Sequence, residues 1–236
     1  MTFRFGRAYR FPTNPEYYWW YSGYQPAGRK DLTSEKASQY EIELDQQLGK
    51  DVNLLVRGYY YEVDDYIRTI FGYKPSRVVY NIDEVQFKGV ELEIEYNVSP
   101  TVRLWANYTR QETEKEGDVL DQSMSLTDEL PELPKDKINI GVSYGRKDGI
   151  RAELSMRYVD ERHVVGGDPT KPGGSYLAEM DSYVDVDLRF SYPIRGGENG
   201  AEIRLEVAGE NLLSEDIEED YGYPMPGATV MVGLSA

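Results

Sequence analysis

Carboxylates recur at every second position in several stretches of this sequence, with apolar residues between them. They include Glu41, Glu43, Glu91, Glu93, Glu95, Asp185 and Asp187. Two carboxylates held at a set spacing across a sugar are sufficient for glycoside hydrolysis. A solvated wall explains the same pattern without catalysis, because arginines such as Arg103 and Arg189 alternate in the same way. We therefore predict no catalytic role for these residues.

His163 is the only histidine, and Asp160 and Glu161 precede it closely. An Asp–His pair is a possible base for hydrolysis, but no nucleophile-elbow or paired-Asp motif accompanies it. The chain has no Cys, which excludes disulfides, thiolate catalysis and Cys-based zinc sites. A single histidine also excludes a multi-histidine metal centre. The sequence therefore predicts neither an enzyme nor a bound metal or cofactor.

Clustered aromatic residues form the best candidate for ligand binding. They are Tyr17, Tyr18, Trp19, Trp20, Tyr21 and Tyr24. Tyrosine and tryptophan rings stack on flat, amphipathic ligands. Two other roles remain open, because such residues also form interfacial girdles and pack the base of their own loop. We expect no helix here, and the segment from Arg10 to Thr33 is interpreted as a long loop.

The net charge of −16 and the absence of basic clusters argue against a nucleic-acid partner. The chain has 21 Tyr but only six Phe. Tyrosine suits a surface that is apolar at one end and wet at the other.

No apolar run reaches the length of a transmembrane helix. The first seven residues lack the apolar region of an export signal, so we expect either a cytoplasmic chain or a missing beginning.

The stretch 88–109 shows which elements carry the alternating residues. Val90, Leu92 and Ile94 fall on one face and the glutamates between them on the other, a period of two that predicts a β-strand. The same test predicts about ten long strands. They cover Thr2–Tyr9, Ser34–Leu48, Val52–Ile70, Arg77–Val98, 102–111, Lys137–Gly145, Ile150–Glu161, Ser182–Tyr192, 202–207 and 230–234. The segments 112–135, 163–181 and 214–227 are interpreted as long loops.

Long and short connections alternate along this series of strands. In an antiparallel meander, all long loops then lie at one end and all tight turns at the other, as in outer-membrane barrels. Strands of about 9–11 residues or more match the span of a tilted transmembrane strand, whereas sandwich strands are nearer 5–6. The sequence therefore predicts an all-β, up-and-down meander that forms part of a transmembrane β-barrel. A soluble sandwich or small barrel is the less favoured alternative.

Several segments, in order along the chain, resemble TonB-dependent outer-membrane receptors. They are Gly6–Thr13, Ser34–Lys36, Phe87–Glu93, Leu104–Thr109, Leu133–Asn139, Asn211–Leu213 and Tyr221–Gly227. The resemblance implies a 22-stranded barrel with an N-terminal plug domain. It also implies import of ferric siderophores, haem, cobalamin or similar ligands with energy from TonB.

The chain departs from that pattern, since it has about ten strands, no plug and no terminal aromatic residue. We therefore expect residues 1–236 to be a C-terminal barrel segment of a receptor. TonB would be a partner only through the missing N-terminal plug. Such a segment forms either an open curved sheet or a self-closed barrel. The predicted lumen-lining residues are Glu91, Glu93, Glu95, Arg103, Asp185, Asp187 and Arg189.

The resemblance further implies a Gram-negative outer membrane, with lipid, lipopolysaccharide and a small metal chelate as partners. Acidic loops favour a neutral or cationic ligand, or divalent ions that bridge lipopolysaccharide, although solubility alone also explains them. Two other functions remain open. One is a small self-contained outer-membrane barrel that acts as a pore, adhesin or protease, and the other is a soluble carbohydrate-binding β domain.

Overall fold

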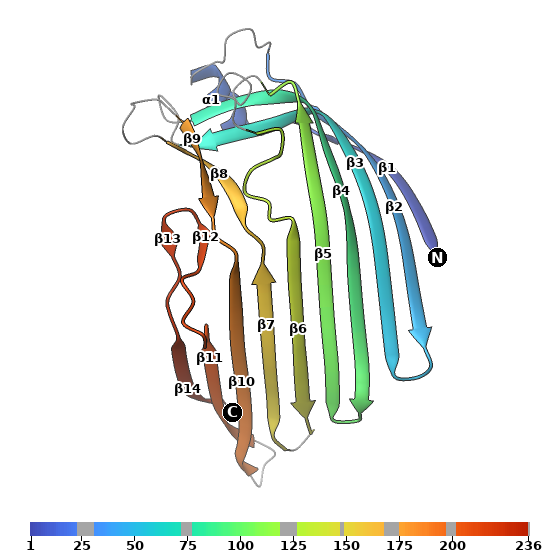
Figure 1. The fold of residues 1–236 in the computed structure, drawn as a ribbon, viewed down its shortest axis with the longest axis vertical. Coiled ribbons are helices and arrows are strands. Elements are labelled where there is room, and N and C mark those ends of the chain that lie inside the picture. Colours follow the sequence, from blue (N-terminus) through green and yellow to red (C-terminus); the bar gives the residue numbers. More distant parts are fainter. Residues whose placement is uncertain are drawn as a thin grey trace.

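The computed structural model describes residues 1–22, 31–71, 77–118, 127–146, 149–167, 175–196 and 202–235. Ten strands form one antiparallel sheet in which each pairs with the next long strand along the chain (Figure 1). They are β1 (Thr2–Arg10), β2 (Glu35–Leu48), β3 (Val52–Phe71), β4 (Arg77–Ser99), β5 (Val102–Glu116), β6 (Asp136–Gly145), β7 (Arg151–Val159), β10 (Tyr183–Gly196), β11 (Glu202–Glu210) and β14 (Thr229–Ser235). The predicted all-β meander of ten strands is confirmed.

The sheet is open. β1 and β14 stand at the two ends of the strand order, and within the described residues neither pairs with the other. The curved sheet in Figure 1 is therefore the first of the two predicted forms, and the self-closed barrel is not formed. Each end strand leaves a row of backbone groups without a strand partner, which is costly in hydrocarbon.

Register along the sheet keeps the two predicted faces separate. In the β4–β5 pair, Ile94 lies opposite Ala106 and Glu93 opposite Asn107. The apolar residues of β4 are exposed, with Val90 at 49% and Ile94 at 38% of their full accessible surface. No second layer covers this apolar face within the described residues, so the sheet is not half of a sandwich.

The long connections contain more structure than the sequence predicted. Residues Asn14–Ser22 form helix α1, where a loop without a helix was expected. β5 continues to Glu116, beyond its expected end. The other predicted loops hold the paired strands β8 (Arg162–Gly167) and β9 (Ser175–Met180), and β12 (Glu218–Asp220) and β13 (Tyr223–Pro224). These elements are shorter than the strands of the main sheet, so their alternation is hard to recognise.

A capping box explains helix α1. The Glu16 carboxylate accepts a hydrogen bond from the Thr13 amide at 2.7 Å, and the Thr13 hydroxyl accepts one from the Glu16 amide at 3.4 Å. The pattern Thr-x-x-Glu with a proline in the first turn is a helix-start signal that the sequence contains. Among the described residues, no helix has the length and apolar character needed to cross a membrane.

The ends of β3 and β4 bend away from the rest of the sheet and run across its upper end in Figure 1. We call residues 66–71 and 77–82 the roof. The bend lies at Asp65, whose φ is 57°. There the Asn81 amide donates to the Asp65 carbonyl at 2.5 Å and to the Thr33 carbonyl at 3.1 Å. The Asn81 side chain therefore fixes the bend by satisfying backbone groups that the ladder leaves free.

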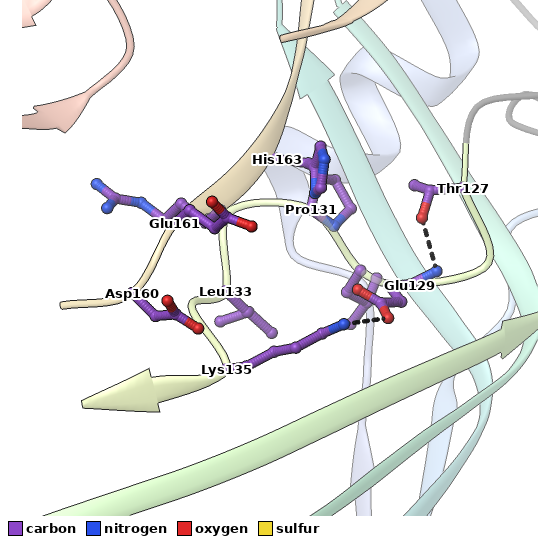
Figure 2. Close-up of a pocket in the computed structure, with 10 residues that line it drawn as sticks. Thr127, Glu129, Pro131, Leu133, Lys135, Asp160, Glu161 and His163 are labelled. Carbon is purple, nitrogen blue, oxygen red and sulfur yellow. Dashed lines mark hydrogen bonds and ion pairs between the residues drawn. The ribbon is translucent and has the colours of Figure 1, made fainter. Parts of the chain in front are cut away.

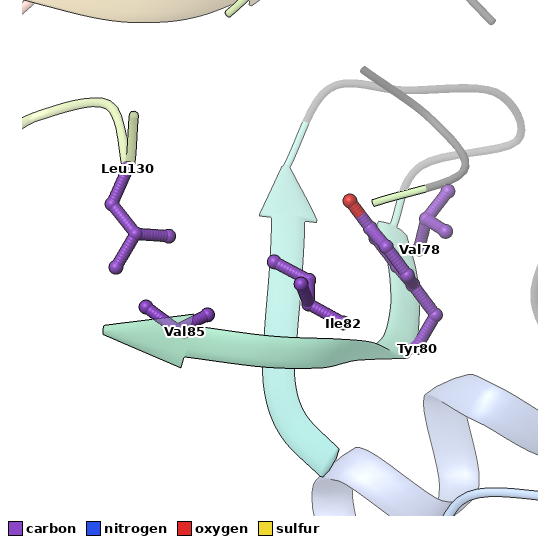
Figure 3. Packing of buried hydrophobic residues seen from close by; sticks show 5 residues of the cluster. All are labelled: Val78, Tyr80, Ile82, Val85 and Leu130. Atoms are coloured by element: carbon purple, nitrogen blue, oxygen red, sulfur yellow. The ribbon is translucent and has the colours of Figure 1, made fainter. Parts of the chain in front are cut away.

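Both faces of the roof are buried. On one face Val78, Tyr80 and Ile82 pack with Val85 and with Leu130 from the β5–β6 connection (Figure 3). On the other face Ile67 and Val79 pack with Leu32, and Trp19 and Trp20 of α1 lie against them. Of the five largest fully buried side chains among the described residues, Val78, Val79, Tyr80 and Ile82 lie in the roof, and Val85 lies just beyond it on β4.

Candidate functional site

The seven residues predicted to line a lumen share one face of the sheet. Paired residues of neighbouring strands point to the same side, and the register links Glu95 through Trp105, Gly141 and Ser155 to Asp187. Alternation along β4, β5 and β10 then adds the other members, Glu91, Glu93, Arg103, Asp185 and Arg189. We call this side the polar face.

Ion pairs run across the first four strands on the polar face. Arg4 binds Glu43 at 2.9 Å, and Arg57 binds both Glu43 and Glu91 at 2.9 Å. Beside the tight turn, Arg103 binds Glu95 at 3.3 Å. Opposite charges on neighbouring strands stabilise the pairing modestly, because water still reaches them. This arrangement fits a solvated wall better than a pair of catalytic acids.

Helix α1 divides the aromatic cluster between two environments. Trp19 and Trp20 pack on the roof, as the loop-packing alternative requires. The Tyr17 hydroxyl donates to the Leu32 carbonyl at 3.4 Å. Tyr18 and Tyr21 are 64% and 85% exposed and lie three residues apart, which places them on one side of the helix. Tyr24 lies outside the described residues. Among the described members of the cluster, Tyr18 and Tyr21 are therefore the most open to a ligand.

His163 lies at the start of β8 beside a cavity of about 60 Å³ (Figure 2). Lys135 binds Glu129 there at 2.7 Å, and Asp160 accepts a hydrogen bond from the Tyr158 hydroxyl at 2.9 Å. Within the described residues, no hydrogen bond joins His163 to Asp160. The cavity has room for a few water molecules only. The geometry gives no support to an Asp–His hydrolase.

A buried charge network lies where the roof meets the end of β5. The Asp118 carboxylate binds Arg68 of the roof, the Lys115 ammonium at 3.0 Å and the Tyr80 hydroxyl at 2.8 Å. Burial alone would raise the pKa of Asp118, but the charges of Arg68 and Lys115 and the Tyr80 hydrogen bond hold this pKa below its usual value. The network was not predicted from the sequence, because Asp118 falls in a segment interpreted as a loop.

Three carboxylates gather on the side opposite the polar face. Ligand oxygens of Glu62, Asp64 and Glu84 lie within 4.8 Å of one another. The sequence predicted no metal site, and an exposed acidic cluster by itself assigns none.

A second charged cluster joins the wall to the β11–β14 connection. Arg157 binds Asp185 at 3.1 Å and Glu219 of β12 at 2.9 Å. The Arg157 guanidinium also lies over the Tyr183 ring, 5.4 Å from its centroid. Asp185 was predicted from the sequence as part of the wall. The link from its partner Arg157 to Glu219 was not predicted, because 62 residues separate Arg157 from Glu219.

Comparison with known proteins agrees with this architecture. A family model described as "TonB dependent receptor-like, beta-barrel" matches residues 2–212. The chain belongs to the TonB-dependent receptor family. The resemblance predicted from the sequence is therefore confirmed, and members of this family are receptors and transporters of Gram-negative outer membranes.

Solved structures of TonB-dependent receptors share the fold. The copper transporter OprC matches 98% of the chain with a TM-score of 0.73 and 20% identity, and the match covers 35% of OprC. The pyoverdine receptor FpvA of Pseudomonas aeruginosa matches 97% with a TM-score of 0.70 and 15% identity, over 32% of FpvA. The ferric-catecholate receptor Fiu of E. coli in its closed form matches 98% with a TM-score of 0.67 and 18% identity, over 32% of Fiu. The chain therefore spans about a third of the length of these receptors.

Proposed function

We propose that residues 1–236 form one part of the barrel wall of an outer-membrane receptor that takes up a small metal chelate with energy from TonB. The observation that carries the proposal is the two-faced sheet. Its apolar face is exposed from Val90 to Val98 of β4, and its polar face is linked by ion pairs across the first four strands. Only an environment with lipid on one side and water on the other suits both faces at once.

In this arrangement the apolar face contacts lipid, and Glu91, Glu93, Glu95, Arg103, Asp185, Asp187 and Arg189 face the lumen. The short turns then lie on the periplasmic side, and the roof with α1 lies outside the cell. The exposed tyrosines of α1, Tyr18 and Tyr21, stand at the mouth that a ligand must pass. Lipopolysaccharide surrounds the same end.

The open edges of the sheet support the view that the wall is larger than ten strands. β1 and β14 each need a partner strand in hydrocarbon, because every unpaired backbone group there costs several kcal/mol. Further strands of the same receptor are the simplest partners. The coupling to TonB then belongs to a plug domain of the complete receptor, as in the family.

Uptake in whole cells tests the proposal. The receptor gene is expressed from its own locus in cells with and without TonB, and accumulation of iron-55 is measured with a panel of ferric hydroxamates and catecholates. Copper-64 and labelled cobalamin extend the panel. We expect TonB-dependent accumulation of one member and its loss on deletion of the receptor gene. Recovery of the chain in the soluble fraction without detergent would contradict the proposal.

A further inference from the structure

Two arginines hold the β12–β13 hairpin: Arg157 of β7, on the polar face, and Arg162 at the start of β8. Arg157 donates from one nitrogen to Glu219 at 2.9 Å and from the other to Asp185 at 3.1 Å. Arg162 donates from Nη2 to the carbonyls of Glu218 and Glu219, at 3.0 and 2.8 Å. A short, acidic hairpin therefore lies directly over a pair of guanidinium groups.

Two buried polar atoms of this cluster lack a hydrogen-bond partner among the described residues. One is Nη1 of Arg162, a residue that is 7% exposed, and the other is Oδ1 of Asp185. Leaving a buried donor or acceptor unsatisfied costs about 1–3 kcal/mol, and more for charged groups. A donor and an acceptor in one cluster indicate a position that a further polar group completes.

We propose that Arg157, Arg162 and Asp185 form a ligand subsite for a carboxylate that has a hydroxyl group beside it. The carboxylate accepts hydrogen bonds from Arg162 Nη1 and from the Arg157 nitrogen that now binds Glu219. The hydroxyl donates to Asp185 Oδ1. The Glu219 carboxylate occupies part of the subsite when no ligand is bound. This inference rests on the proposed function, since it names a ligand group for the same receptor.

The charges of the cluster favour replacement of the Glu219 carboxylate by a ligand carboxylate. Arg157 and Arg162 balance Asp185 and Glu219, so removal of the Glu219 carboxylate leaves one net positive charge. The Glu219 side chain is 50% exposed, and exposed ion pairs are held weakly. Ile217 next to the hairpin is buried against Val159 and Tyr183. The hairpin can therefore release Glu219 while Ile217 keeps its base in place. Charge-assisted bonds from arginine then select a carboxylate over a neutral group.

Binding of L-malate to the purified receptor in detergent tests the subsite. Carbon-13-labelled malate is titrated and followed by NMR line broadening, with succinate as the matched probe that lacks the hydroxyl group. We expect Glu219→Gln to raise the affinity for malate about fivefold to tenfold, because it removes the competing charge. Arg162→Gln abolishes the binding, and Asp185→Asn abolishes the preference for malate over succinate.

The neighbouring variant Glu218→Gln is the control, because Glu218 contacts Arg162 only through its backbone carbonyl. It leaves malate binding unchanged. Absence of malate binding in the Glu219→Gln receptor would overturn the proposal and assign the two unpaired atoms to trapped water. Malate binding by the Arg162→Gln receptor as tight as that of the wild type would overturn it as well. Heat-modified mobility on gels confirms that each variant is folded. Because uptake is not measured, a failure here leaves the proposed receptor function standing.

Discussion

Asp118 shows how much one residue contributes when charges are buried together. Its carboxylate is the partner of both Arg68 and Lys115, and all three side chains are almost fully buried. Replacing a buried ion pair with apolar residues is often tolerated, whereas removing one partner leaves an uncompensated charge. The roof therefore depends on Asp118 more than on any of the exposed ion pairs of the polar face.

Asp118→Asn tests this dependence. We expect a loss of about 3–5 kcal/mol in the stability of the roof, because two buried cations lose their counter-charge. Hydrogen exchange of residues 66–71 and 77–82 measures the loss. Glu112→Gln, which breaks exposed pairs with Lys88 and Arg110, is the control and leaves the exchange unchanged. Equal protection in wild type and Asp118→Asn would show that packing alone holds the roof.

The lowered pKa of Asp118 also predicts a pH dependence. A carboxyl whose pKa is lower in the folded state stabilises the fold fully above its unfolded pKa of about 3.9, and the contribution disappears as the pH falls through the folded value. We expect constant protection of the roof between about pH 7 and pH 5, and a decrease below about pH 3.9. Asp118→Asn removes this contribution to the acid-dependent decrease. A decrease that begins above pH 5 would point to another group.

At the scale of elements, the strands of the wall were predictable and the structure in the long connections was not. The β4 arm of the β4–β5 hairpin alternates without interruption from Val90 to Val98, because each of its two faces meets the same environment throughout. The roof, residues 66–71 and 77–82, packs apolar side chains on both faces, so the alternation is lost there although the strands continue. Short hairpins such as β12–β13 give too few residues for a period to be recognised.

The candidate site residues also divide into those on the wall, which were predictable, and those in the long connections, which were not. The residues predicted to line a lumen share one side of the sheet, because alternation along each strand fixes the face on which a residue lies. Their partners were not predictable, since Glu219 meets Arg157 only through the folding of a connection over the wall. The Thr13 and Glu16 pair was different. It is a local signal that the sequence contains. It was missed because the aromatic cluster that follows was interpreted as part of a loop.

Helix α1 depends on this local signal. Thr13→Ala removes the hydroxyl that accepts from the Glu16 amide, and we expect a loss of about 1 kcal/mol in helix stability. Trp19 and Trp20 then become less ordered, which a red shift of their fluorescence measures. Thr13→Ser keeps the hydroxyl and restores the wild-type emission. An unchanged spectrum in Thr13→Ala would indicate that packing on the roof determines the helix.

At the scale of the whole molecule, the two faces of the wall require different surroundings. Ile140 lies on the apolar face near the middle of β6 and is exposed, while Asn107 lies on the polar face opposite Glu93. If lipid covers the apolar face, a charge is tolerated on one side and not on the other. This asymmetry is a property of the sheet and of no single residue.

A matched pair of arginine substitutions in the complete receptor tests the asymmetry. We expect Ile140→Arg to destabilise the folded barrel by about 2–4 kcal/mol, the cost of an arginine on the lipid face near the midplane. Asn107→Arg gains a nearby carboxylate and has little effect. Urea unfolding in lipid vesicles, followed by tryptophan fluorescence, measures both. Equal effects of the two substitutions would argue against lipid contact.

The continuity of β3 and β4 from wall to roof has a mechanical consequence. Strands of 20 and 23 residues extend for about 65–75 Å at 3.3 Å per residue, well beyond an apolar band about 25 Å tall. The roof is thus joined to the wall through the bend where Asn81 holds Asp65, and it is held further by Leu130 and by the Arg68–Asp118 ion pair. A force on α1, such as that from a large molecule bound to it, is transmitted through Trp19 and Trp20 to the roof and so to the β3–β4 ladder. The wall on which the lumen depends would carry that load.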